Sequence, residues 1–137
     1  MHHIAIMKKS WNLTHKILSG EKKVESRWYK TRRAPWDKVH TGDTVYFKNS
    51  GEPVTLKAQV RSVKQFANLT SQEVHNILNR YGKDIGLERE DIPKYYEIFQ
   101  DKRYCVLIFL HNPEEVQPFQ ISKKGYGAMS AWICVDP

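Results

Sequence analysis

Short apolar runs separated by polar turns recur along the chain, a pattern typical of a protein built mainly from short strands. Their expected ranges are residues 3–7, 23–29, 44–48, 54–66, 116–121 and 131–135, with 54–66 forming one strand or two. The run at 104–110, Tyr-Cys-Val-Leu-Ile-Phe-Leu, is continuously apolar. It is predicted to be a central strand covered on both faces.

Between the first two strands, residues 11–19 carry apolar positions at helical spacing. Ser10 stands where a side chain can cap the N-terminus of this helix. Gly20 suits the left-handed residue that ends it. The segment is therefore predicted to be a helix that reverses at Gly20 into the following strand.

A second predicted helix has the clearest start signal in the chain. Thr70 and Glu73 form the Thr-x-x-Glu pattern of a capping box, and apolar residues follow at helical spacing as far as Gly82, where the helix is expected to end. A third helix is predicted within residues 88–102, with Pro93 in its first turn.

These patterns amount to about six or seven strands and two or three helices. Most connections are too short for crossovers between parallel strands. The predicted fold class is therefore α+β, with a mixed, mostly antiparallel sheet curled into a small barrel and helices beside it. No repeat, linker or low-complexity tract interrupts the 137 residues, so a single domain over residues 1–137 is expected.

Positive charge is concentrated in the first third of the chain. Residues 1–50 hold eleven Lys and Arg against four Asp and Glu, which accounts for the whole net charge of +7, while the remainder is balanced. A basic patch of this kind favours a polyanion, because binding phosphates releases their condensed counterions. RNA or a nucleotide is the predicted partner, and a solvated basic face is the alternative.

Several other classes of protein find no support in the composition. Cys105 and Cys134 lie in apolar runs and are interpreted as reduced core thiols. The six histidines lack the spacing of a metal site, and no glycine-rich phosphate loop is present, so neither metal nor cofactor is predicted. No stretch approaches the roughly 20 apolar residues of a membrane helix, and the apolar N-terminal run is short for a secretion signal, so a cytoplasmic location is expected.

The candidate chemistry lies where the first helix turns into the second strand. Lys22 stands at the turn, and Glu25 and Arg27 project from one face of the strand. Arg27 can grip a phosphate with two nitrogens, Lys22 can act as a point charge, a base or a nucleophile, and Glu25 can act as a general acid or base. The alternative is a surface strand with salt bridges.

This motif and its surroundings resemble the signature of the ASCH family, a branch of the PUA-like superfamily. The resemblance covers most of the chain. It implies a PUA-like β-barrel with a cleft lined by the motif, in proteins that bind or process RNA. The residues that carry it are Trp11, then Gly20, Lys22, Glu25 and Arg27, then Gly42 and Asp43 before a strand, and finally residues 127–133 with Trp132.

Some small ASCH members are amidohydrolases that act on an acylated cytidine. In those members the motif lysine is catalytic, and a threonine stands where this chain has Glu25. This chain keeps Lys22 but has neither the threonine nor any Asp or Glu between residues 54 and 68 to supply a second carboxylate.

Further candidates lie among the basic and aromatic residues and in a loop with two glycines. Trp36 lies beside two arginines and is the predicted platform for a stacked base. Tyr46 and Ser130 are possible assistants of Lys22 and Glu25 if the protein is an enzyme. The full predicted nucleic-acid surface is Lys22, Arg27, Arg32, Arg33, Trp36, Lys48, Lys123, Lys124 and Ser130.

Three functions remain open on this basis. The first is a module that binds RNA or a nucleotide. The second is a hydrolase acting on RNA or a modified nucleoside, with Lys22 and Glu25 catalytic. The third is a protein-interaction domain whose basic face meets an acidic protein partner.

Overall fold

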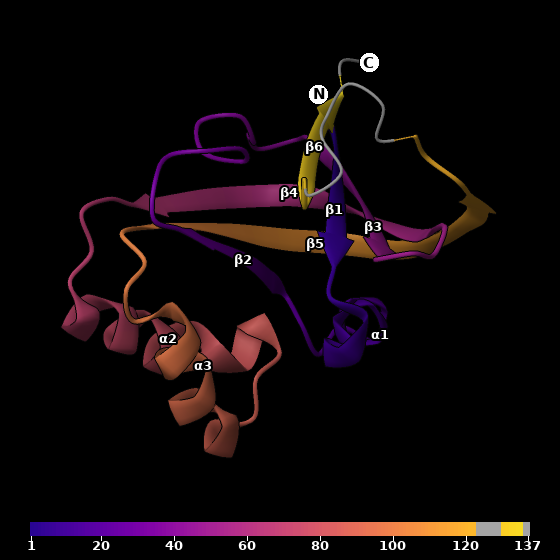
Figure 1. The fold of residues 1–137 in the computed structure, drawn as a ribbon. Helices are drawn as coiled ribbons and strands as arrows, with labels where there is room; N and C mark the ends of the chain where they lie inside the picture. The colour runs from indigo at the N-terminus through magenta and orange to yellow at the C-terminus, as the bar shows by residue number, and fades with distance from the viewer. Residues whose placement is uncertain (123–129, 136–137) are drawn as a thin grey trace.

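The structure, a computed structural model, describes residues 1–122 and 130–135. Its six strands form one curled, half-barrel sheet, and three α-helices and two short 3-10 helices connect them (Figure 1). The strands are β1 (His2–Met7), β2 (Val24–Tyr29), β3 (Thr44–Asn49), β4 (Val54–Phe66), β5 (Tyr104–Phe119) and β6 (Trp132–Val135). The helices are α1 (Leu13–Ser19), α2 (Ser71–Ile85) and α3 (Ile92–Phe99), with 3-10 turns at Lys9–Trp11 and Arg89–Asp91.

The sheet has the strand order β2-β5-β4-β3-β1-β6. Strands β1 and β3 are parallel, and every other pair is antiparallel. The predicted fold class, an α+β protein with a mixed and mostly antiparallel sheet, is therefore confirmed. Because the order begins with β2 and ends with β6, the curl leaves β2 with one unpaired edge among the described strands.

Two hydrophobic cores lie on opposite faces of the sheet, and β5 contributes to both. Val106 and Ile108 point into the hollow of the curl, whereas Cys105 and Leu107 point outward against helices α2 and α3. Successive side chains of a strand alternate between faces, so a strand covered on both faces needs a continuous apolar run. The prediction of a central strand at 104–110 is confirmed.

Strand β5 is longer than predicted. It continues through residues 116–119, which the sequence pattern had assigned to a separate strand. Its partner β4 is likewise one strand, and the register of the pair shifts between Val54 and Leu56, Lys57 and Gln59, and Val60 and Ser62. Such irregularities bend a strand without ending it, which explains how the pair curls.

The predicted helix ends needed two corrections. Ser10 lies in the first 3-10 turn, and α1 begins after Asn12, which has a positive φ of 53° and makes no side-chain cap. Helix α2 does not end at Gly82 but continues to Ile85, and Gly86 is its left-handed cap; a Cβ added at Gly82 would lie 3.3 Å from the Ile92 side chain of α3. Its capping box forms as predicted, with Thr70 accepting from the Glu73 backbone.

Both cysteines are reduced, as predicted, with Cys105 buried and Cys134 half-buried. Burial raises the pKa of the Cys105 thiol well above its usual value. None of the helices within the described ranges is long and apolar enough to cross a membrane.

Candidate functional site

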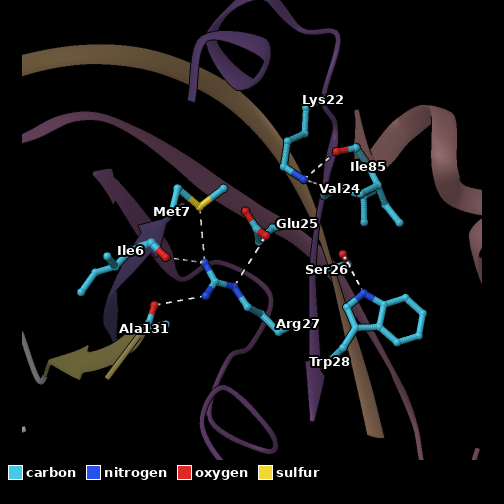
Figure 2. A network of polar contacts seen from close by, with 10 residues as sticks. All are labelled: Ile6, Met7, Lys22, Val24, Glu25, Ser26, Arg27, Trp28, Ile85 and Ala131. Atoms are coloured by element: carbon cyan, nitrogen blue, oxygen red, sulfur yellow. Dashed lines mark hydrogen bonds and ion pairs between the residues drawn. The ribbon is translucent and has the colours of Figure 1, made fainter. Parts of the chain in front are cut away.

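The candidate site is a gap in the half-barrel between the free edge of β2 and the segments at Ile6–Met7 and Ala131, here called the seam (Figure 2). A cavity of about 450 Å³ opens along it. Pockets that bind small molecules are typically of this size. The residues lining it include Glu25, Arg27, Trp11, Trp28, Phe99 and Ser130.

Arg27 spans the seam with its guanidinium group. One terminal nitrogen donates to the Ala131 carbonyl at 3.2 Å, and the other lies 3.4 Å from the Ile6 carbonyl and 3.3 Å from the Met7 sulfur. The guanidinium carbon lies 5.2 Å from the centre of the Trp132 ring. Arg27 is thus held rigidly between strands, and its terminal nitrogens are occupied by backbone groups instead of facing an open phosphate site.

Glu25 lies beside Arg27 on the same strand and is only 4% exposed. Its Oε1 is 3.6 Å from Arg27 Nε, which is an ion pair but too long for a good hydrogen bond. Its Oε2 and Arg27 Nε are both buried and have no hydrogen-bond partner within the described residues. The sequence prediction that these two side chains share a face of the strand agrees with this arrangement.

Aromatic side chains form the opposite wall of the cavity. The rings of Trp28 and Phe99 are stacked, with centroids 5.0 Å apart and an angle of 8° between their planes. The Trp28 indole nitrogen donates to Ser26 Oγ at 3.0 Å, which fixes its orientation. Trp11 meets Tyr95 edge-on at 5.3 Å. Helix α3 thus supplies part of the wall, which could not be inferred from the motif alone.

Lys22 is fully buried, and its ammonium group faces backbone carbonyls (Figure 2). Its Nζ donates to the carbonyls of Val24 at 2.8 Å and of Ile85 at 2.7 Å, the latter in the last turn of α2. Burial lowers the pKa of Lys22, an effect that the nearby Glu25 carboxylate opposes. The lysine of the motif therefore holds the end of a helix, and it does not line the 450 Å³ cavity.

A second, narrow cavity of about 40 Å³ lies behind the first, and both Lys22 and Glu25 line it. Trp11, Leu13 and Phe99 border both spaces. The volume accommodates water but no larger molecule. The two candidate catalytic residues are thus brought near each other, with only Glu25 reaching the larger cavity.

The arginine loop after β2 lies next to the site. Arg33 stacks on Tyr29, which lines the cavity, with 5.1 Å from the guanidinium carbon to the ring centre. Burial raises the pKa of Tyr29, and the charges of Arg27 and Arg33 partly offset the rise. Arg32 lies over both Trp36 and Tyr104, at 5.5 Å from each ring.

Trp36, the predicted stacking platform, is packed edge-on against Tyr104 at 5.3 Å and is partly buried in the inner core. The ring of Trp36 therefore has less exposed surface on which a base could stack. Arg32 and Arg33 are themselves exposed, and Arg33 lies next to the cavity through its contact with Tyr29.

The other predicted residues fall in different places. Tyr46 packs between His2 and Phe119 and does not line the cavity, and Lys48 is buried on β3 outside the cavity lining. Ser130 does line the cavity, next to Ala131. Lys123 and Lys124 lie outside the described residues.

A buried polar chain was missed by the sequence reasoning. His3 is fully buried, its Nε2 lies 2.8 Å from Asp43 Oδ2, and its Nδ1 accepts from the Trp132 indole nitrogen at 3.1 Å. The tautomer is therefore fixed, with the proton on Nε2. The only signal in the sequence was His3 within an apolar strand and Asp43 after Gly42, two positions too far apart to be connected by spacing.

No family model matches the sequence, and no curated protein matches it. Among solved structures, the chain is similar to the ASCH protein from Zymomonas mobilis, with a TM-score of 0.69 and 16% identity over 98% of this chain and 87% of that chain. Structures of two point mutants of that protein have the same TM-score. The N-terminal domain of Staphylothermus marinus McrB has a TM-score of 0.61 and 13% identity, over 99% of this chain and 88% of that chain.

At these identities the similarity concerns the fold. The chain has an ASCH-like α+β fold along nearly its whole length, as the motif around Lys22, Glu25 and Arg27 predicted.

Proposed function

We propose that this protein binds single-stranded RNA or a nucleotide at the seam, with a base against the aromatic wall and phosphates on the neighbouring arginine loop. The observation that carries the proposal is the cavity itself. It combines stacked aromatic rings, a buried carboxylate and a rigid guanidinium in one space of about 450 Å³.

The charge distribution supports the same function. Arg33 continues the positive surface outward from the cavity through its contact with Tyr29, and Arg32 lies beyond it over Trp36. Base stacking on aromatic rings and phosphate contacts from arginine are the two interactions on which single-strand binding usually depends. Base stacking supplies a contact that tolerates any sequence, and the phosphate contacts supply affinity that depends on salt.

The test is binding of a fluorescein-labelled single-stranded RNA decamer, followed by anisotropy at 50 and 200 mM salt. Affinity is expected to fall with salt, because each phosphate contact releases counterions. The double substitution Arg32→Gln, Arg33→Gln should weaken binding and lower the salt slope by about one to two.

The matched control is the double substitution Arg80→Gln, Arg89→Gln, which also removes two positive charges, one from α2 and one from a 3-10 turn, neither of them lining the cavity. It is expected to leave the affinity unchanged. Equal weakening by the control and by the loop variant would mean that only net charge matters, and binding without any dependence on salt would exclude the phosphate contacts.

A hydrolase is the second candidate, and one observation favours it: Glu25 and Lys22 line a common narrow cavity behind the site. In that function Glu25 is the residue placed to act on a substrate in the larger cavity, because Lys22 Nζ already donates to two backbone carbonyls. Following the same RNA by gel would detect cleavage. Cleavage that persists in a Glu25→Gln variant would exclude Glu25 as its catalytic base.

A further inference from the structure

Glu25 and Arg27, two residues that line the cavity, each hold one buried polar atom without a hydrogen-bond partner among the described residues. Glu25 Oε2 is an acceptor and Arg27 Nε is a donor, and both are buried without a hydrogen-bond partner among the residues that the structure describes. Leaving a buried polar group unpaired is costly, and most such groups in folded proteins have a partner. A pair of them in the wall of a cavity therefore indicates where a ligand binds.

Arg27 Nε makes no hydrogen bond with the Glu25 carboxylate. The Nε of Arg27 and the Oε1 of Glu25 are 3.6 Å apart, and the remaining guanidinium nitrogens are directed at the Ala131 and Ile6 carbonyls. Those backbone contacts hold the guanidinium plane in place across the seam. The donor is thus held in a fixed orientation before any ligand arrives, which lowers the cost of binding.

The ligand that fits must offer a donor beside an acceptor on one flat edge. Its faces must be apolar enough to lie against the stacked rings of Trp28 and Phe99. Every nucleobase has such an edge, the one used in Watson–Crick pairing, and a planar ring that stacks on aromatic side chains. Arg33, next to the cavity through its contact with Tyr29, lies where the attached phosphate can be bound.

Resting on the proposed function, we infer that Glu25 and Arg27 Nε together bind the Watson–Crick edge of one unpaired base inserted at the seam. The partner is then single-stranded nucleic acid, because in a duplex this edge is already used for pairing. Glu25 is a specificity-determining residue in this assignment: it selects for a free N–H on the inserted base, and it leaves phosphate binding to the arginine loop.

The first part of the test varies the RNA and uses the unchanged protein, so the fold is not affected. Four RNA decamers of one sequence that contains only adenosine and uridine are compared: single-stranded, annealed to its complement, with all bases removed, and with every uridine replaced by 3-methyluridine and every adenosine by N6,N6-dimethyladenosine. The single strand should bind about tenfold more tightly than each of the other three, because the others leave the buried donor and acceptor unpaired.

The second part of the test compares protein variants and measures whether Glu25 causes the preference for the single strand. Glu25→Gln keeps the size of the side chain but removes the anionic acceptor, and it should reduce the preference for the free-edge strand to less than about threefold. The matched control, Glu114→Gln, changes an exposed carboxylate on β5 and should retain the full preference. Circular dichroism melting of each variant shows whether the fold persists.

The outcomes separate this inference from the proposed function. Equal binding of all four RNAs overturns base-edge recognition while leaving salt-dependent RNA binding in place. A preference that survives in Glu25→Gln overturns the assignment to Glu25. No binding to any RNA overturns both.

Discussion

Two buried titratable side chains show that a residue's type does not decide its role. Lys22, the charged residue at the centre of the motif, donates its hydrogen bonds to backbone carbonyls and supports the fold. His3, which has no motif around it, is held between Asp43 and Trp132 in one tautomer. In both cases the burial of the side chain and its hydrogen-bond partners determine what it does.

The His3 contacts predict how stability depends on pH. Burial lowers the pKa of His3 more than the hydrogen bond with Asp43 raises it. A protonated ring would place an N–H against the Trp132 N–H, so the folded state favours the neutral form. The unfolded chain then binds the proton more readily, and stability falls as pH drops below the ordinary imidazole pKa of about 6.5.

Urea unfolding between pH 7.5 and 5.5 should therefore show a falling free energy of unfolding, with a smaller slope in His3→Gln. The Met1 amino group and His40 also face this cluster, and both proteins contain them. Equal slopes in the two proteins would contradict the prediction.

At the scale of elements, the end of α2 is held by one lysine of α1 and one of the turn that follows it. Lys22 Nζ donates to the Ile85 carbonyl at 2.7 Å, and Lys16 Nζ donates to the Gly86 carbonyl at 2.8 Å. Positive groups at a helix C-terminus satisfy its last carbonyls and interact well with the helix dipole. The motif turn and α2 thus form one unit, and it supports the wall of the site.

Gly86→Ala is predicted to disrupt this unit. Gly86 has a φ of 101°, and an added Cβ would lie 3.2 Å from the Lys22 Cβ. Gly51→Ala is the matched control, with a φ of 80° and nothing within 4 Å of the added atom. Backbone strain costs both variants about 1–2 kcal/mol. Gly86→Ala should lower the free energy of unfolding further, and equal losses in urea denaturation would show that the contact with Lys22 carries no cost.

At the scale of the whole molecule, the half-barrel is joined across its open side by a side chain and not by a strand pair. Arg27 on β2 reaches Ile6 at the end of β1 and Ala131 before β6, which are remote in the sequence (Figure 2). A seam closed in this way leaves space for a cavity, whereas a continuous hydrogen-bonded barrel would have none at this position. The same residue thus links the fold to the candidate site.

Arg27→Met is predicted to destabilise the protein by about 3 kcal/mol, because it breaks the contacts across the seam and leaves the buried Glu25 carboxylate unpaired. Adding Glu25→Met should restore part of the loss, since no buried charge then remains at this position. The measurement is the free energy of unfolding of the two single variants and the double variant. Strict additivity of the single effects would show that the two side chains are not coupled.

Local sequence determined much of the architecture. The capping box of α2, the proline at the start of α3 and the continuous apolar run of β5 each depend on neighbouring residues, and each formed as predicted. The motif also placed Glu25 and Arg27 correctly, because side chains two positions apart in a strand share a face. Local patterns are sufficient wherever the deciding interactions lie within a few residues.

Contacts between distant segments decided the rest. The direction of Lys22 depends on Ile85, the partners of His3 come from β6 and the turn before β3, and Phe99 of α3 completes the cavity wall. These contacts cannot be predicted from spacing along the chain, because they depend on how the sheet curls and where α2 and α3 pack on it. The sequence therefore determined which residues are candidates for the chemistry, and the tertiary structure decided which of them face the cavity and which are buried to hold the fold.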